Sequence, residues 1–356
     1  MADVGVFDDA RLEDPRALAE ADAQLRWLAT AGARIRMTAA GMAAAGSAER
    51  LLESFDLGRR PRGVLVVGGE ARLIRAVLEP ICPVPLVAWP FDSLPGWVGA
   101  LDLVVVLAAT GSHPGLQSIA SEARRRGAPL LVAAAPGSAV AELAASRSTL
   151  VLPVPTSDPL SAAVGVLEFL HALGLGPAVS PELVAEAVDA VAEQCSPHID
   201  LAHNPAKELA LGLADALPLV WGGSVLSARA SRRIAEALRL AGGRPALAAD
   251  ASDLVPLVAA AHRRDPFADP FDGGHDEPLR PVLVLLDEDS DSPSVRRDRG
   301  ILAALADEHD VRIRVVRGTS PGQRPVATYA ALLMHGLYGA AYLAIGLGRP
   351  GSAHGF

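Results

Sequence analysis

Residues 204–239 read NPAKELALGLADALPLVWGGSVLSARASRRIAEALR, and this stretch decides the fold that the sequence predicts. An apolar helical pattern follows Lys207, a short strand covers Pro218–Trp221, and Gly222-Gly223-Ser224 leads into a second helical pattern. A strand that ends in paired glycines before a helix is typical of an α/β domain. The stretch therefore predicts that a second domain begins in the middle of the chain.

The length and composition also favour two α/β domains. At 356 residues the chain exceeds the size of one typical hydrophobic core. Half of the residues are hydrophobic but only 4% are aromatic, so the core must consist mainly of Ala, Val and Leu in thin layers of helix on sheet. The net charge of -9 repels a phosphate backbone, and we expect no nucleic acid partner.

The cysteines and the first residues favour a cytoplasmic location. Cys82 and Cys195 are far apart and form no Cys-x-x-Cys element, so neither a disulfide framework nor a zinc site is expected. The acidic segment from Met1 to Asp14 lacks the basic and apolar regions of a signal peptide. We therefore expect a cytoplasmic protein with reduced thiols.

One segment, Ala327–Gly348, has no charged residue and is long enough to cross a bilayer. His335 and the glycines Gly336 and Gly339 interrupt it, and basic residues distinguish neither flank. The sequence thus predicts a buried helix, no membrane partner, and a hydrogen-bonded core position for His335.

Short apolar strands alternate with helices in two successive parts of the chain. After a helical lead-in, the first part has strands at 63–67, 101–107, 129–134 and 149–152, with a helix at 116–126. After helices at 160–175 and 181–194, the second part has strands at 218–221, 245–248, 281–286 and 311–316, with helices at 228–240, 253–262 and 296–309. This alternation predicts two tandem doubly wound parallel-sheet domains of the α/β class, with a helical N-terminal lead-in and a C-terminal helix.

The predicted boundaries follow from this alternation. They are a lead-in at 1–60, a first domain at 61–160, linking helices at 161–205, a second domain at 206–348 and a flexible tail at 349–356. Residues 264–280 are rich in Asp, Pro and Gly and predict a disordered loop, and 287–298 form a second acidic loop.

The element Asn204-Pro205-Ala206-Lys207 and the spacing of Arg229, Ile234 and Glu236 resemble those of the bifunctional phosphoglucose/phosphomannose isomerases of bacteria and archaea. Members of that family are tandem sugar isomerase (SIS) proteins, and Tyr342-Leu343-Ala344 resembles their C-terminal helix. The chain is identified as a divergent member. The resemblance implies two SIS-type domains and aldose-ketose isomerisation through an enediol, between glucose or mannose 6-phosphate and fructose 6-phosphate.

The resemblance also implies the catalytic residues. Glu236 would remove and return the proton between adjacent carbons, while Arg229 and Lys207 would supply positive charge to the enediolate or the phosphate. The residues alone allow another interpretation. Arg232 and Arg233 precede Glu236 by four and three residues, as on an exposed helix face with ion pairs.

Ligands of open parallel sheets gather at the carboxyl ends of the strands, where loops and helix N-termini offer N–H groups. A purely structural role is the alternative to ligand binding at two of these loops. It would be a turn at Gly68-Gly69 and a helix cap at Ser112. Glu70 and Ala108 depart from the family pattern, because the carboxylate would repel a phosphate and the alanine replaces a serine. The candidate substrate-binding residues here are Gly68, Gly69, Thr110, Gly111, Ser112 and Ser138.

The histidine that opens the sugar ring in the family is absent from residues 248–254, so His203 or Asp250 would have to replace it. His198, Asp200 and His203 form too weak a pattern for a metal site, and no metal is expected.

Two functions of different classes stay open. One is the isomerase that uses Glu236, and the other is a non-catalytic sugar-phosphate-binding or regulatory SIS protein that has lost catalytic residues. In either case we expect a hexose phosphate or a related sugar phosphate as ligand, no cofactor, and a homodimer.

Overall fold

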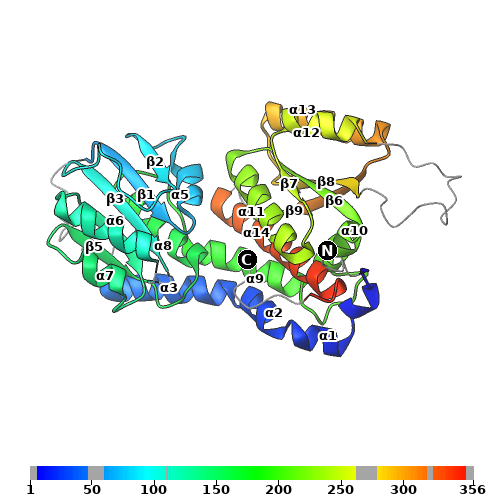
Figure 1. Ribbon diagram of the computed structural model, residues 1–356, viewed down its shortest axis with the longest axis horizontal. Helices are drawn as coiled ribbons and strands as arrows, with labels where there is room; N and C mark the ends of the chain where they lie inside the picture. The colour runs from blue at the N-terminus through cyan, green and yellow to red at the C-terminus, as the bar shows by residue number, and fades with distance from the viewer. Residues whose placement is uncertain are drawn as a thin grey trace, which may run out of the picture. The chain divides into compact units, whose positions relative to one another are not determined.

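The computed structural model describes residues 6–46, 60–109, 111, 113–261, 279–318 and 324–349. The chain forms two compact units, each built on a parallel sheet (Figure 1). Residues 31–186 are called the sheet A unit, and residues 1–30 with 187–356 are called the sheet B unit. The predicted class of two doubly wound parallel-sheet domains is confirmed.

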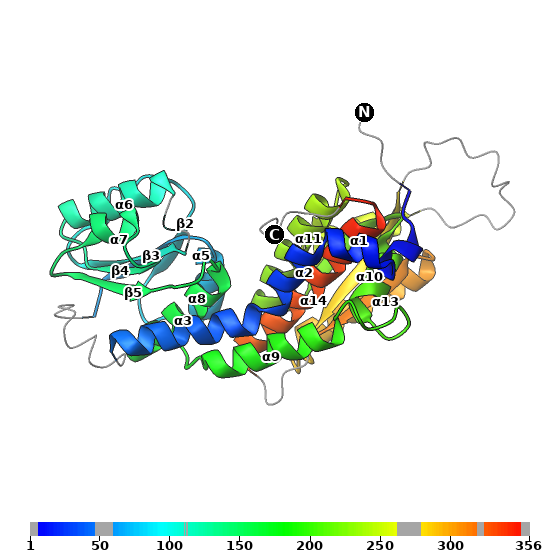
Figure 2. The same ribbon diagram turned by 90° about the horizontal axis from the view of Figure 1, so that it is seen from below.

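Sheet A has five parallel strands in the order β2-β1-β3-β4-β5. They are β1 (Gly63–Gly68), β2 (Leu86–Trp89), β3 (Asp102–Ala108), β4 (Leu130–Ala134) and β5 (Thr149–Pro153). The helices α6 (Pro114–Arg125) and α7 (Ala139–Ala144) cover one face, and α3 (Ala31–Ala45), α5 (Ala71–Leu78) and α8 (Pro159–Ala172) cover the other (Figure 2). The central strands are continuous apolar runs because both faces are buried.

Sheet B has four parallel strands in the order β7-β6-β8-β9. They are β6 (Ala216–Gly222), β7 (Leu247–Ala248), β8 (Arg280–Asp287) and β9 (Arg312–Arg317). The helices α12 (Ala251–Ala259) and α13 (Pro293–Glu308) lie on one face, and α10 (Pro205–Leu213), α11 (Val225–Gly242) and α14 (Pro325–Gly346) lie on the other (Figure 1).

The helical lead-in contributes to both units. The short elements η1 (Asp9–Leu12), α1 (Pro15–Glu20) and α2 (Asp22–Ala29) belong to the sheet B unit, where η1 and α2 contact α14. Helix α3 belongs to the sheet A unit, and α9 (Pro181–Gln194) contains the division between the units. Each of the two units thus contains part of the lead-in and part of the linking helices.

Helix α14 is the one described helix that is long and apolar enough to cross a bilayer, and its apolar window is completely buried in the fold. It packs between α10 and α11, and the glycines that interrupt the apolar run make this close packing possible. A Cβ at Gly336 would lie 2.2 Å from Cγ1 of Ile234, and one at Gly339 would lie 2.7 Å from Cδ2 of Leu209. The prediction of a buried core helix is confirmed.

His335 on α14 has the core position that was predicted. Its side chain is 8% exposed, and its Nδ1 lies 3.3 Å from the carbonyl oxygen of Ala331. Burial lowers the pKa of His335, which favours the neutral imidazole.

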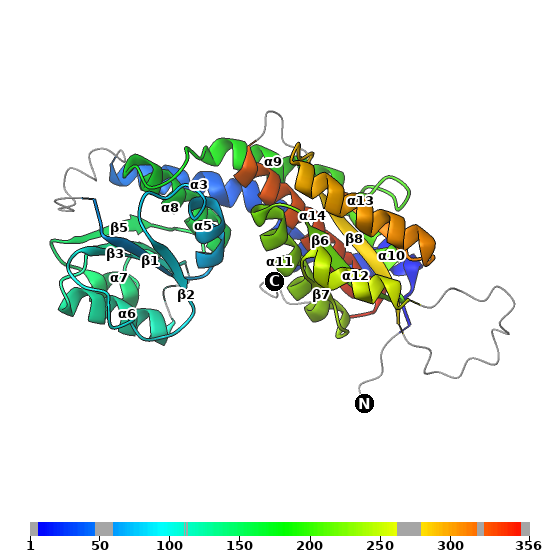
Figure 3. The same cartoon turned by 90° about the horizontal axis from the view of Figure 1, so that it is seen from above.

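Several elements differ from the prediction. Strand β2 and helices α5 and α7 were missed, and β2 lies at the edge of sheet A beside β1 (Figure 3). The acidic segment after β8 is a loop only as far as Ser292, because α13 begins at Pro293. The loop predicted at 264–280 falls outside the described residues up to residue 278, and Arg280 already belongs to β8.

The two cysteines should differ sharply in reactivity. Cys195 is fully buried, and burial raises its pKa to about 12, whereas Cys82 is only half-buried. Because the thiolate is the reactive form, a disulfide reagent at about pH 8 should modify Cys82 and spare Cys195. We expect one titratable thiol in the native chain and two after denaturation. Rapid modification of two thiols in the native protein would contradict this burial.

Candidate ligand-binding site

The loop after β1 approaches the backbone of β3 closely. Gly68 has φ 98°, and a Cβ there would lie 2.1 Å from the carbonyl oxygen of Leu107. The N–H of Gly69 donates to that same oxygen over 3.3 Å. Only glycine fits at position 68, so the paired glycines fix this loop at the carboxyl end of the sheet.

The loop after β3 is similarly close to the start of α7. Gly111 has φ 67°, and a Cβ there would lie 2.5 Å from Cβ of Ser138. Ser138 is the N-cap of α7 and accepts from the N–H of Ala141 over 3.4 Å. The structure thus brings Gly111 and Ser138 together, while Thr110 and Ser112 fall outside the described residues.

A cavity of about 390 Å³ opens at this end of sheet A. Its size is within the range of about 300–1,000 Å³ that is usual for small-molecule sites. Gly68 and Gly69 line it, and they are the only predicted site residues of the described chain that do so. The other walls are Val67, Trp89, Pro90, Phe91, Asp92, Leu107, Ala108, Ala109, His113, Leu116, Pro159 and Ala162.

The segment after β2 gives the cavity an aromatic wall. The rings of Trp89 and Phe91 meet edge to face, with centroids 5.0 Å apart and an interplanar angle of 66°. Sequence reasoning missed this wall, because Pro83, Pro85 and Pro90 flank the four-residue strand β2 and favour a loop there. The available signal was the pair of aromatic residues in a chain that has few.

Asp92 places a negative charge beside the first turn of α6. A Cβ at Gly115 would lie 2.1 Å from Oδ1 of Asp92, so the carboxylate rests on this glycine. The positive end of a helix dipole favours an anion, and at α6 the carboxylate of Asp92 already lies in this position. This side of the cavity is therefore better suited to sugar hydroxyl groups than to a second anion.

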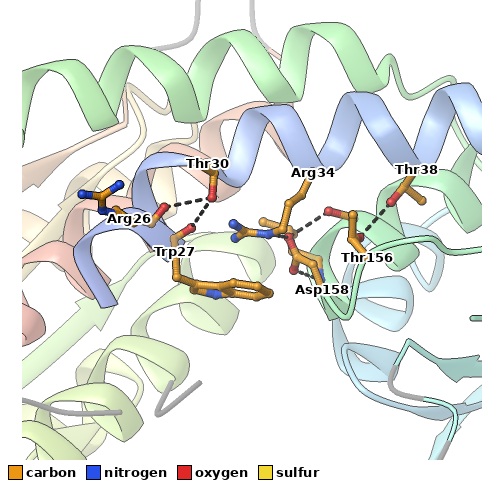
Figure 4. Close-up of polar contacts among 9 residues, drawn as sticks. Arg26, Trp27, Thr30, Arg34, Thr38, Thr156 and Asp158 are labelled. Carbon is orange, nitrogen blue, oxygen red and sulfur yellow. Dashed lines mark hydrogen bonds and ion pairs between the residues drawn. The ribbon is translucent and has the colours of Figure 1, made fainter. Parts of the chain in front are cut away.

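A buried ion pair fixes the start of α8, whose first turn lines the cavity. Nε of Arg34 donates to Oδ2 of Asp158 over 3.0 Å, and the two side chains are 11% and 8% exposed (Figure 4). Asp158 also accepts from the N–H of Leu160 at 3.0 Å and from Oγ of Ser161 at 2.8 Å. The partners are 124 residues apart in sequence, so no local pattern could have predicted the pair.

The corresponding end of sheet B is already occupied by a carboxylate of the chain. Glu288 follows β8 and accepts from the N–H and the hydroxyl of Ser224, at 3.0 and 2.5 Å, and from the hydroxyl of Ser227 at 3.2 Å. Ser224 is the N-cap of α11 and forms a capping box with Ser227. Glu288 thus accepts hydrogen bonds from donors at the N-terminus of α11, as a bound anion would.

Glu236, the predicted base, lies far along α11. It is the twelfth residue of a helix that begins at the carboxyl end of β6, so it lies about 17 Å along the axis from that end. Glu236 thus lies away from the loops at the carboxyl end of its own sheet, since α11 runs back along the sheet, and its role as the base stays a prediction. Its side chain is 39% exposed and pairs with Arg233 at 3.3 Å, as the alternative interpretation expected.

Arg229 and Glu236 are seven residues apart and lie on one side of α11, with Arg233 between them. Arg229 is 8% exposed. Arg232 is directed to another partner, Asp250, at 3.9 Å. The spacing that the resemblance singled out thus forms one stripe of charged side chains on this helix.

Lys207 has a structural position. It is 1% exposed, and its Nζ donates to the carbonyl oxygens of Pro197 at 3.1 Å and Ile199 at 2.7 Å. The ammonium also lies 5.6 Å from the ring centroid of Tyr342. Asn204 caps α10 by accepting from the N–H groups of Ala206 and Lys207, both at 3.1 Å. The Asn-Pro-Ala-Lys element therefore ties the loop before α10 to the core, and its contact with a ligand stays a prediction.

His203 is an exposed residue. Its Nδ1 lies 2.6 Å from Oδ1 of Asp200, and the two side chains are 78% and 62% exposed. This hydrogen bond lowers the pKa of Asp200. The described residues contain no group of three or more His, Cys, Asp or Glu side chains that could hold a metal ion.

A second cavity, of about 430 Å³, lies along β9 in the sheet B unit. It is lined by Arg314, Arg317, Glu208 and His335 among others, and by none of the predicted site residues.

Comparisons with known proteins agree with this architecture. Residues 202–351 match the family model of the bacterial phospho-glucose isomerase C-terminal SIS domain. Comparison with curated protein sequences finds no match.

Solved structures that resemble the chain share its fold at low sequence identity. The tagatose-6-phosphate ketose/aldose isomerase from Escherichia coli is 15% identical with a TM-score of 0.62, and the match covers 93% of each chain. The C-terminal domain of glucosamine-fructose-6-phosphate aminotransferase from Francisella tularensis is 10% identical with a TM-score of 0.65, covering 92% of this chain and 96% of that one. A putative phosphosugar isomerase from Bacillus subtilis is 15% identical with a TM-score of 0.57, covering 85% and 92%.

Proposed function

We propose that this divergent SIS-domain protein, which is phosphosugar isomerase-like in its fold, binds a sugar phosphate at the carboxyl end of sheet A without isomerising it. The observation that carries the proposal is the cavity of about 390 Å³, which lies where doubly wound sheets bind their ligands. The backbone at Gly68 and Gly69 forms one side of this cavity.

Three features of the sheet B unit favour binding over catalysis. Glu236 is paired with Arg233 and lies far from the carboxyl end of its own sheet. The ammonium of Lys207 donates to two carbonyl oxygens of the fold. His203, the substitute for a ring-opening group, lies on an exposed turn beside Asp200. Each of the three side chains that isomerisation would require thus has a structural role or an exposed position.

The second candidate is an aldose-ketose isomerase of the hexose phosphates. The stripe of Arg229, Arg233 and Glu236 on α11 favours it, because the half-exposed carboxylate at its end can accept a proton and the two guanidinium groups can stabilise an enediolate. The cytoplasmic location, the lack of a cofactor and the homodimer stay predictions for both candidates.

Thermal unfolding and turnover, measured on the same samples, separate the two functions. Glucose, mannose and fructose 6-phosphates are each added at increasing concentration, and a coupled assay follows their interconversion. A ligand that binds only the native state raises the melting temperature. We expect stabilisation without turnover. Turnover would favour the isomerase, and the absence of stabilisation by all three sugar phosphates would contradict the proposal.

Glu236→Gln tests the role of the carboxylate directly. The substitution keeps the size and the hydrogen bonding of the side chain but removes the base, so we expect ligand-induced stabilisation to persist unchanged. If the wild type isomerises a sugar phosphate, the same change should lower the rate by a factor on the order of 100 or more. Glu79→Gln is the matched control, because it removes another helical ion pair, with Arg75 at 2.9 Å. Full isomerase activity in Glu236→Gln would exclude Glu236 as the base.

A further inference from the structure

The aromatic wall of the cavity combines one fixed ring with one exposed ring. Nε1 of Trp89 donates to the carbonyl oxygen of Ser93 over 2.7 Å, which fixes the indole and uses its only polar group. Phe91 meets the indole edge to face, yet the residue is 61% exposed. The two rings thus leave apolar surface uncovered at the wall of a cavity of about 390 Å³.

Polar groups in this cavity come from a few positions. Asp92 and His113 are its titratable lining residues, and the glycine backbone after β1 borders it. A cavity with an apolar wall and few polar groups orients a ligand that has one apolar face and a polar rim.

Glucose 6-phosphate and mannose 6-phosphate meet this requirement in their closed pyranose form. A closed pyranose ring has a face of C–H groups that can cover an aromatic ring, while its hydroxyl groups point outward from the rim. An open-chain sugar or polyol has no such face. It also has more rotatable bonds, whose freedom is lost on binding.

We infer that the cavity selects the closed pyranose form of its sugar phosphate, with the C–H face of the ring on Phe91 and Trp89 and hydroxyl groups toward Asp92. This inference rests on the proposed function, because it specifies the ligand of the same site. The aromatic rings act as specificity residues for the ring form.

Ligands with a fixed ring state test the inference. Methyl α-D-glucopyranoside 6-phosphate and methyl α-D-mannopyranoside 6-phosphate cannot open, and sorbitol 6-phosphate cannot close. Calorimetric titration of the full chain gives the dissociation constants. We expect at least one locked ring to bind within about 3-fold of its parent sugar phosphate, and sorbitol 6-phosphate to bind at least about 10-fold more weakly.

Two variants separate stacking from general effects on the loop. Phe91→Ala should weaken binding of the locked ring by roughly 5- to 10-fold and leave the weak binding of sorbitol 6-phosphate unchanged. Trp97→Ala is the matched control, because Trp97 is also an exposed aromatic residue of the loop after β2, at 45%. The ring of Trp97 would lie 3.7 Å from a Cβ added at Gly63, so it packs at the amino end of β1 and away from the cavity. Removal of this ring should leave both affinities unchanged.

The outcomes distinguish this inference from the proposed function. Equal or tighter binding of sorbitol 6-phosphate, or a Phe91→Ala variant that loses both ligands equally, would overturn the selection of the pyranose while sugar-phosphate binding stands. Failure of every sugar phosphate, open or closed, to bind would overturn the proposed function and the inference together.

Discussion

Asp158→Ala should lower the free energy of unfolding of the sheet A unit by about 3–5 kcal/mol, as expected when one partner of a buried ion pair is removed. The substitution deprives the buried guanidinium of Arg34 of this carboxylate and removes the N-cap of α8. Urea unfolding followed by circular dichroism measures the change. Because α8 lines the cavity through Pro159 and Ala162, ligand-induced stabilisation should decrease as well.

Glu182→Gln is the control for Asp158→Ala. It removes the ion pair between Arg36 and Glu182. Arg36 lies on α3, as Arg34 does, but its side chain is 38% exposed and that of Glu182 is 55% exposed. An exposed pair contributes less than about 1 kcal/mol, so this variant should unfold like the wild type. Equal losses of stability in the two variants would show that burial of the Arg34–Asp158 pair is not what matters.

Gly68→Ala should destabilise the sheet A unit by at least about 3 kcal/mol, because a left-handed backbone and a steric conflict act together. The added Cβ would lie 2.1 Å from the carbonyl oxygen of Leu107, and this atom belongs to the backbone of the central strand β3 and cannot move aside. The cavity borders this point, so ligand binding should be lost under conditions where the variant is still folded.

Gly96→Ala controls for the loss of a glycine as such. A Cβ at Gly96 would have no neighbour within 4 Å, and the unfolding midpoint should stay close to that of the wild type. A stable Gly68→Ala variant that still binds ligand would contradict the close approach of β1 and β3 at this site.

The fold could be predicted from the sequence because each central strand can be recognised from its own residues. Val64–Val67 and the strand around Val105 are uninterrupted apolar runs, as buried parallel strands require. Strand β2 is also apolar but was missed, because prolines at 83, 85 and 90 flank it and favour a loop, and because it is only partly buried at the sheet edge. Its stability comes from pairing with β1, which is a property of the tertiary structure.

The site was predicted less completely, for a physical reason of the same kind. The glycines at 68 and 69 could be recognised, because a required backbone conformation restricts the residue type. The aromatic wall after β2 and the pair between Arg34 and Asp158 depend on distant segments that meet only in the folded chain. Lys207 was recognised by its motif, but its hydrogen bonds to Pro197 and Ile199 show that a motif identifies a position and not its role.

The carboxylate of Glu288 supplies the N-terminus of α11 with a negative group that belongs to the chain itself. A tethered group has an effective concentration that the chain itself sets, and the concentration of free phosphate in solution does not change it. The first turn of α11 therefore keeps its hydrogen-bond partner whether phosphate compounds are scarce or abundant. Within the described residues, the N-terminus of α11 in the sheet B unit thus holds a carboxylate of the chain itself, while the sheet A unit has an open cavity at the carboxyl end of its strands.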